Sequence, residues 1–447
     1  MMSMKMNVSF AQKAILNKGG LNHLKIEIIP PEIKNKKERT KPVLMIVVLD
    51  RSGSMSGTVK RQETGLNMVN GYSHSQFSPN YVHSAIETNT KMRQAINSTV
   101  KLIQMLSKED LFGLVAFDDI AVKVQDLTHI LPENQNLIIN NVRNIYTGGC
   151  TNISLALQMA REMITKEHLK NYNCKIVVLS DGQANSGIQD ADNFAFLALK
   201  YLQDGISVSA LGIGYDYDSK VMNAIATGGG GLFYHIEDLE KLDNVFQEEL
   251  KLSNTVKAKN VRLILEIPDL IEIGANMNDY KQKVIDKNIE VYIGDIDNSR
   301  SVFFEIRNNF VDTDVRFHVK VAYQTVEGDE CVVAVTRKLT VVDSKEKLEE
   351  FPKDQSIIDN VLSLIKHRTF LETSDMYEKG KTDELRGVFS STINYVQNIC
   401  SSYSLNENTG VTSTLDELTN LNETYASNSV SKSFTKNLYA QSARSLR

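Results

Sequence analysis

The stretch from residue 42 to residue 253 constrains the fold more than any other part of the chain, because short apolar runs alternate there with amphipathic segments. The apolar runs are rich in β-branched residues and carry almost no charge. Strands that are apolar on both faces are typical of a mainly parallel sheet covered by helices on both sides. The sequence therefore predicts an α/β domain with a doubly wound, mainly parallel sheet over residues 42–253. The five runs are VLMIVVL (43–49), LFGLVAF (111–117), CKIVVLS (174–180), ISVSALGIG (206–214) and GLFYHI (231–236).

Two of the intervening segments have helical periodicity, and one link is too short for a helix. NTKMRQAINSTVKLIQML (89–106) and NISLALQMAREMI (152–164) repeat apolar residues at the spacing of one helix face. In contrast, IAVKV (120–124) follows the second apolar run after only two aspartates. A parallel crossover needs a dozen or more residues, so we expect an antiparallel strand at the sheet edge.

The pattern changes to a period of two over residues 254–344. VRLILEI (261–267) alternates apolar and other residues, and several later segments do the same, which predicts an antiparallel β-sandwich. Within residues 1–41, HLKIEII (23–29) also has strand character. We expect this early strand to join the sandwich, which makes the α/β domain an insertion. The alternative is a strand added to the edge of the α/β sheet.

The remaining chain returns to helical periodicity. Residues 345–424 predict a helical region, in which the break at Lys379-Gly380-Lys381 separates two helices of a hairpin, the second between Thr382 and Cys400. Residues 425–447 carry four basic residues among serines and no acidic residue. We expect them to form a flexible tail. The first helix has an apolar stripe of Ile357, Ile358, Val361, Leu362 and Ile365.

Composition excludes several classes of partner and site. The 447 residues include 50 basic and 55 acidic side chains, a net charge of −5 that provides no cationic surplus for nucleic acid. No apolar run approaches the roughly 20 residues of a membrane-spanning helix, and the N-terminus does not resemble a secretory signal. The four cysteines, Cys150, Cys174, Cys331 and Cys400, are widely spaced. This spacing disfavours structural zinc and disulfides and favours a reducing, cytoplasmic location.

Oxygen-bearing side chains follow the apolar runs at the points where the predicted strands end. Asp50, Ser52 and Ser54 follow the first run, and Asp181 follows the run that ends at Ser180. The loop TGGCTN (147–152) adds Thr151 at the start of a helix. Because ligands of open α/β sheets bind beyond the carboxyl ends of the strands, these loops are expected to meet. Two carboxylates and three hydroxyls suit a hard cation such as Mg²⁺, and not zinc.

The three motifs D-x-S-x-S, T-G-G-x-T and S-D-G, in this order, resemble the metal-ion-dependent adhesion site of von Willebrand factor A (VWA) domains, which are Rossmann-like. The resemblance implies that Asp50, Ser52, Ser54, Thr151 and Asp181 hold Mg²⁺, with Ca²⁺ or Mn²⁺ as alternatives. It implies that the hydroxyls bind the metal directly and the aspartates largely through water. An open position on the metal then accepts an Asp or Glu from a partner protein. The order of regions along the chain is also similar to bacterial relatives of inter-alpha-trypsin inhibitor heavy chains.

The sequence departs from that family pattern directly after the D-x-S-x-S loop. The family enters its first helix soon after the D-x-S-x-S motif, whereas residues 58–88 intervene here. This insert is predicted either to form a cap that selects partners or to be a surface excursion that touches nothing. Its two histidines, His74 and His83, lack a third clear metal ligand, so we interpret them as ordinary loop residues.

These features favour a divalent-metal-dependent protein-binding module or adaptor. A scaffold whose metal is only structural is the first alternative. A metal-dependent hydrolase is the second, and it needs a general base near the metal-bound water. None of the eight histidines falls inside the three motif loops, and Ser180 has no histidine partner assigned by the sequence. We therefore expect a protein that is not an enzyme.

Overall fold

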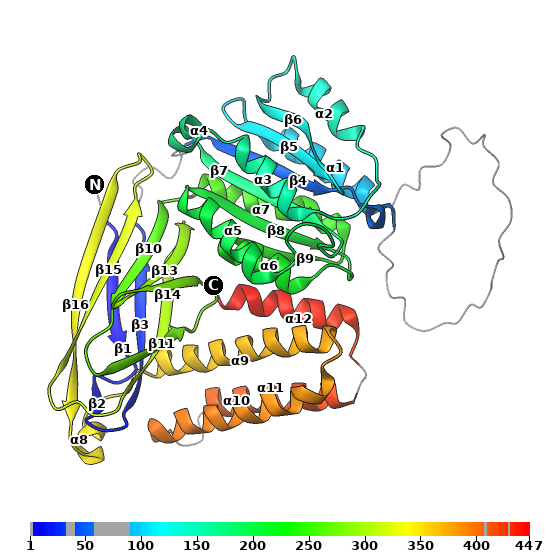
Figure 1. The fold of residues 1–447 in the computed structure, drawn as a ribbon. Coiled ribbons are helices and arrows are strands. Elements are labelled where there is room, and N and C mark those ends of the chain that lie inside the picture. Colours follow the sequence, from blue (N-terminus) through cyan, green and yellow to red (C-terminus); the bar gives the residue numbers. More distant parts are fainter. Residues whose placement is uncertain (1–2, 33–40, 58–89, 406–408, 428–429) are drawn as a thin grey trace.

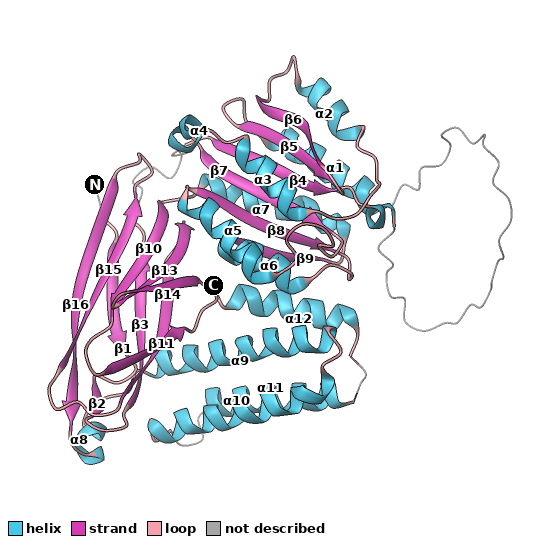
Figure 2. Cartoon of the chain, viewed as in Figure 1, coloured by secondary structure: helices cyan, strands magenta, loops and turns pink. Residues whose placement is uncertain are grey.

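The computed structural model describes residues 3–32, 41–57, 90–405, 409–427 and 430–447 (Figure 1). In Figure 1 a β-sandwich lies beside an α/β domain, and a group of long helices lies below the α/β domain. The insert predicted at 58–88 lies outside the described residues. Figure 2 shows that strands are concentrated in the first two of these parts and that the third is helical.

The α/β domain contains a six-stranded sheet in the order β6-β5-β4-β7-β8-β9. All neighbouring strands are parallel except β5 and β6, which form the predicted antiparallel pair at one edge. The prediction of a doubly wound, mainly parallel sheet is confirmed. The strands are β4 (Val43–Asp50), β5 (Leu111–Phe117), β6 (Ala121–His129), β7 (Asn173–Ser180), β8 (Ile206–Ile213) and β9 (Gly230–Ile236).

Helices cover both faces of this sheet because its central strands are apolar on both sides. Every residue of β4, β5, β7 and β8 is buried. One face packs against α3, α5 and α6, and the other packs against α1, α2 and α7. The helical segments are η1 (Gly53–Ser56), α1 (Lys91–Met105), α2 (Gln135–Arg143), α3 (Ile153–Glu162), α4 (Lys166–Asn171), α5 (Ala191–Gln203), α6 (Ser219–Gly228), η2 (Leu239–Lys241) and α7 (Leu242–Asn254).

The sandwich consists of the sheets β1-β3-β14-β11 and β12-β13-β10-β15-β16-β2. The early strand β3 pairs with the distant β14, so the N-terminal segment belongs to the sandwich and the α/β domain is inserted within it. All pairs are antiparallel except β16 with β2. The strands are β1 (Lys5–Phe10), β2 (Ala14–Leu16), β3 (Leu21–Ile29), β10 (Ala258–Glu266), β11 (Ile271–Asn276), β12 (Lys281–Ile285), β13 (Asn288–Ile296), β14 (Arg300–Asn308), β15 (Val315–Gln324) and β16 (Glu330–Val342).

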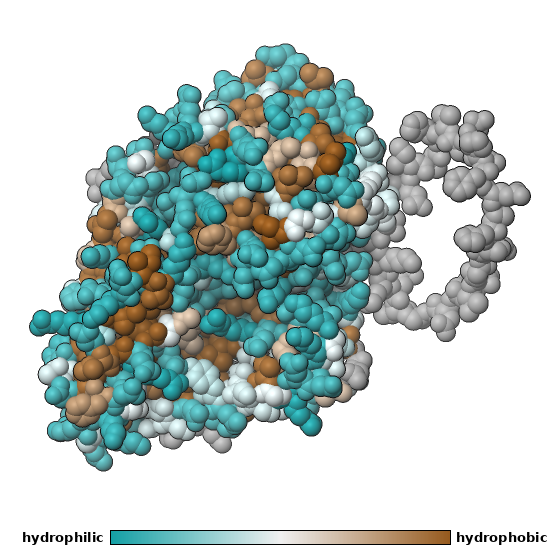
Figure 3. All heavy atoms as spheres, viewed as in Figure 1, coloured by the Kyte–Doolittle hydropathy of each residue, from teal (hydrophilic) through white to brown (hydrophobic). Residues whose placement is uncertain are grey.

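Among the described residues, five helices follow the sandwich. Helices α9 and α10 are joined by a turn in which Gly380 has a φ of 72°, a value that favours glycine. Among the helices of the described residues, none is long and apolar enough to cross a lipid bilayer. Figure 3 shows a face on which hydrophilic residues surround several apolar patches. The helices are α8 (Lys345–Glu349), α9 (Gln355–Glu378), α10 (Thr382–Ser402), α11 (Thr409–Ala426) and α12 (Lys432–Ser445).

The flexible tail predicted at 425–447 is wrong for α12, which packs against β9, α6 and α9. Tyr439 and Ala443 are buried in the core of the α/β domain. The Nζ atom of Lys436 lies 2.6 Å from the carbonyl oxygen of Tyr217 and 2.8 Å from a carboxylate oxygen of Glu378. Helix α12 is held by these apolar contacts and by acceptors for Lys436 on segments that are distant in sequence.

Candidate metal centre

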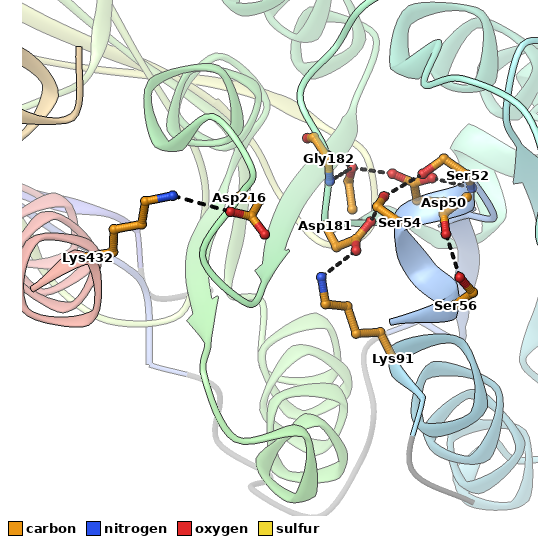
Figure 4. Close-up of polar contacts among 11 residues, drawn as sticks. Asp50, Ser52, Ser54, Ser56, Lys91, Asp181, Gly182, Asp216 and Lys432 are labelled. Carbon is orange, nitrogen blue, oxygen red and sulfur yellow. Dashed lines mark hydrogen bonds and ion pairs between the residues drawn. The ribbon is translucent and has the colours of Figure 1, made fainter. Parts of the chain in front are cut away.

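The predicted metal ligands gather at the carboxyl edge of two neighbouring strands. Asp50 is the last residue of β4, and Asp181 follows the last residue of β7. Because β4 and β7 are adjacent and parallel, the loops that follow them leave the sheet side by side. Figure 4 shows Ser54 of η1 directed toward Asp181, whereas Ser56 donates to the carbonyl of Gly53 in its own turn.

Hydrogen bonds link the first and third motif loops. The backbone N–H of Ser52 donates to Oδ1 of Asp50 at 2.8 Å. The Oγ atoms of Ser52 and Ser54 are 3.0 Å apart, and Oγ of Ser54 donates to Oδ1 of Asp181 at 2.6 Å. Four of the five predicted ligands therefore form one continuous polar network.

The second motif loop brings Thr151 to the same place. The N–H of Thr151 donates to Oδ1 of Asn185 at 2.8 Å, and the N–H of Asn185 donates to the carbonyl of Thr151 at 3.2 Å. A methyl group at Gly182 would lie 3.1 Å from Oγ1 of Thr151 and 3.6 Å from Oγ of Ser54. The hydroxyls of Thr151 and Ser54 thus lie against the same glycine, beside Asp181.

Backbone contacts hold the first two loops together. The N–H of Gly148 donates to the carbonyl of Arg51 at 2.8 Å, and the N–H of Gly53 donates to the carbonyl of Gly149 at 3.3 Å. Gly149 has a φ of 67°, and a methyl group there would lie 2.7 Å from Oδ2 of Asp119. Glycine fits both constraints at this position, which accounts for the second glycine of the T-G-G-x-T motif.

The electrostatics of Asp50 favour a bound cation. Asp50 is fully buried, and this burial raises the pKa of its carboxyl group to about 6. Hydrogen bonds from Ser180 and Ser52 act in the opposite direction. In the part of the chain that the structure describes, no lysine or arginine forms an ion pair with Asp50. A buried carboxylate is costly without a compensating charge, so its surroundings fit a cation.

The donor set also fits a hard divalent cation. Nowhere among the described residues do three or more His, Cys, Asp or Glu side chains gather as a metal cluster. A metal at this edge would therefore depend on the three hydroxyls together with the two aspartates. Alcohol and carboxylate oxygens suit Mg²⁺, Ca²⁺ or Mn²⁺.

Sequence reasoning missed two residues of this site. Oγ of Ser180 donates to Oδ2 of Asp50 at 2.5 Å, so Ser180 positions this carboxylate. The Nζ atom of Lys91, on α1, lies 2.6 Å from Oδ2 of Asp181. Ser180 stands in the S-D-G motif and was identifiable from the sequence. Lys91 follows the insert, and no local pattern connects it with Asp181.

Comparison with known proteins identifies the domain. Residues 82–248 match the family model of the von Willebrand factor type A domain. YfbK of Escherichia coli is 25% identical over 174 residues, which are 38% of this chain and 30% of YfbK. Heavy chain 4 of the inter alpha-trypsin inhibitor from Mus musculus is 25% identical over 218 residues, 47% of this chain and 19% of that protein. This chain thus spans less than a third of the curated relatives that it matches.

Two solved structures share the fold over nearly the whole chain. The von Willebrand factor type A protein from Catenulispora acidiphila has a TM-score of 0.70 at 16% identity, over 99% of this chain and 97% of that chain. The ArnB paralog VWA2 from Sulfolobus acidocaldarius has a TM-score of 0.63 at 15% identity, over 100% and 98%. The α/β domain of this chain therefore matches the VWA family, and VWA domains are generally protein-interaction modules that often depend on a metal. The family match begins after the D-x-S-x-S loop, at residue 82.

Proposed function

We propose that this protein is a divalent-metal-dependent binding module that captures an acidic side chain of a partner protein. In this proposal Asp50, Ser52, Ser54, Thr151 and Asp181 hold Mg²⁺. The metal attracts a partner's Asp or Glu to a coordination position that the protein leaves open. The observation that carries the proposal is the convergence of these five side chains from three loops at one edge of the sheet.

The burial of the two aspartates supports this function. Both Asp50 and Asp181 are fully buried, whereas Ser54 is exposed at the surface of the loop. A cation held beneath the surface by the aspartates would therefore be accessible from the side of Ser54. The same edge carries the exposed side chains of Ile120 and Tyr146, whose position suits contact with a partner.

The proposal includes a cytoplasmic location. All four cysteines have free thiols, and Cys150 is exposed on the second motif loop. Exposed thiols without a disulfide partner are typical of a reducing compartment. Cell fractionation of the source organism with an antibody to this chain tests the location, and recovery in an extracellular or membrane fraction would contradict it.

The central experiment compares wild type with Thr151→Ala and Asp50→Asn as affinity baits in lysate of the source cells. Each bait is used with Mg²⁺ and with EDTA, and retained proteins are identified by mass spectrometry. We expect at least one protein that only the wild type retains, and only with Mg²⁺. Isothermal titration of the same three proteins with Mg²⁺ shows whether the variants have lost the metal.

The scaffold alternative predicts a different pair of results. If the wild type binds Mg²⁺ but retains the same proteins with EDTA, the metal is structural and partner capture is contradicted. If the wild type does not bind Mg²⁺, Mn²⁺ or Ca²⁺, the metal centre itself is contradicted. Circular dichroism of each variant separates loss of binding from loss of the fold.

A further inference from the structure

Lys91 is held firmly beside the candidate metal centre. It is the first residue of α1, and its N–H donates to the carbonyl of Gly57 at 2.9 Å. Thr90 caps the helix by accepting a hydrogen bond from the N–H of Arg93. On the other side, a methyl group at Gly214 would lie 3.4 Å from Cε and Nζ of Lys91. The lysine side chain is therefore confined between Gly214 and Asp181.

The two oxygens of Asp181 have different partners. Oδ1 accepts the hydroxyl of Ser54, which belongs to the predicted ligand set. Oδ2 accepts the ammonium group of Lys91 at 2.6 Å. Figure 4 shows that Lys91 approaches Asp181 from α1, whereas Ser54 approaches from η1. The lysine thus neutralises Asp181 without occupying the side on which the hydroxyls gather.

We propose that Lys91 is a built-in counter-cation that weakens binding of the metal and strengthens capture of the partner's acidic group. This inference rests on the proposed function. A divalent cation and the carboxylates of Asp50 and Asp181 sum to zero formal charge. The ammonium group of Lys91 restores one positive charge to the centre. A neutral centre has little attraction for an incoming carboxylate, whereas a positive one attracts it.

The effect on the metal has the opposite sign for the same reason. A positive charge held close to the site repels the cation and reduces the negative charge that Asp181 presents to it. A unit charge beside a titratable group shifts the pKa of that group by about 1–3 units, which is a tenfold or larger change in its affinity for a proton. We expect a change of about tenfold or more in the affinity for the metal, for the same electrostatic reason. Lys91 is thus a positioning and charge-setting residue, and it is not itself a ligand.

The chain offers a matched control pair in the same domain. Lys175 and Glu249 are joined at 2.6 Å, and their side chains are 7% and 0% exposed. Lys91 and Asp181 are also joined at 2.6 Å, with exposures of 9% and 0%. Lys175→Met therefore removes an equally buried ammonium group, but it does so away from the three motif loops.

The experiment measures two affinities for wild type, Lys91→Met, Lys91→Gln, Lys91→Arg and Lys175→Met. Loss of the free Mn²⁺ signal in electron paramagnetic resonance gives the affinity for Mn²⁺. Acetate is then titrated into the Mn²⁺-loaded protein, and water proton relaxation reports its binding. We expect Lys91→Met and Lys91→Gln to bind Mn²⁺ about tenfold more tightly and acetate about tenfold more weakly. Lys91→Arg, which keeps the charge, and Lys175→Met should resemble the wild type.

Other results overturn the inference. Unchanged or weaker Mn²⁺ binding by both uncharged Lys91 variants would show that the lysine does not oppose the metal. Equal changes in Lys175→Met would reduce the effect to general destabilisation. Absence of Mn²⁺ binding by the wild type contradicts the proposed function. In that case, binding gained by Lys91→Met supports the counter-cation role, and no binding by either protein overturns both proposals.

Discussion

Two buried lysine–carboxylate pairs lie near opposite ends of β7, and their surroundings differ. At the amino-terminal end, Glu249 accepts from Lys175, and both of its oxygens lie 3.0 Å from Oγ of Ser209. At the carboxyl end, Asp181 accepts from Lys91 and Ser54, and it lies near a second buried carboxylate, Asp50. The first pair is neutral, whereas the second group has an excess of negative charge.

This difference distinguishes a structural ion pair from a candidate binding site. The pair of Lys175 and Glu249 connects β7 with α7, and its charges cancel. At the other end, one lysine faces two carboxylates and several hydroxyls on loops at the sheet edge. At the carboxyl end, the described residues leave buried negative charge uncompensated, which favours a bound cation. The balanced pair at the amino-terminal end has no charge left for a ligand and contributes to the fold alone.

The largest expected effect concerns the structural pair. Glu249→Ala leaves the ammonium group of Lys175 buried without its partner, which should lower the free energy of unfolding by about 3–5 kcal/mol. Urea denaturation measures this loss. Glu248→Ala, at an exposed neighbouring position on α7, serves as control and should change stability by less than about 0.5 kcal/mol. A small effect of Glu249→Ala would show that the two ends of β7 are less different than their contacts suggest.

The next effect concerns the metal edge. Mg²⁺ at about 100 times its Kd should stabilise the wild type by about 2.7 kcal/mol, since it binds only the folded protein. Thr151→Ala, if it weakens Mg²⁺ tenfold, reduces this gain to about 1.4 kcal/mol at the same concentration. Thermal unfolding with Mg²⁺ and with EDTA measures both values. Equal stabilisation of the two proteins would remove Thr151 from the ligand set.

A further effect depends on pH and concerns His235 of β9, the strand that packs against the C-terminal helix α12. Burial lowers the pKa of His235 to about 4, and the Nδ1 atom of His235 lies 2.8 Å from the hydroxyl of Tyr217. Glu237 raises this pKa and Lys436 lowers it further, but burial has the largest effect. Between pH 6.5 and about 4, the unfolded chain binds more protons at this residue, so stability falls as pH falls.

His235→Gln tests this pH dependence. The contribution of His235 cannot exceed about 1.4 kcal/mol per pH unit. The difference in unfolding free energy between wild type and His235→Gln should therefore change steadily between pH 6.5 and 4 and should be constant above pH 7. Denaturant titrations across this range measure it. A difference that does not vary with pH would mean that His235 titrates normally in the folded protein.

The smallest expected effect concerns an exposed ion pair between α12 and the loop that follows β8. Lys432 and Asp216 are 3.4 Å apart, with side-chain exposures of 74% and 70%. Solvent screens such a pair, so Lys432→Ala should change stability by less than about 0.5 kcal/mol. Lys436→Met, on the same helix, removes a buried ammonium group and should cost more. Equal effects of the two variants in urea denaturation would show that burial does not determine the contribution of these lysines.

The strands of the α/β sheet and most of the candidate site could be predicted from the sequence, whereas the C-terminal helix α12 could not. The apolar runs identified the strands of the α/β domain, and the residues that follow Leu49 and Leu179 identified two of the motif loops. The helix α12 was missed because its serines and basic residues resemble those of a flexible segment, although Tyr439 and Ala443 pack in the core. Its stability depends on acceptors such as Glu378 and the carbonyl of Tyr217, which no local pattern reveals.

The sequence by itself determined which residues end the parallel strands and carry oxygen, because an apolar run is a local feature and parallel neighbours end at the same edge. Only the tertiary structure decided which charges face those oxygens. Lys91 is separated from Asp181 by 90 residues along the chain, yet their side chains are in contact. Charge compensation acts through space, so the partner of a buried carboxylate depends on how the elements pack.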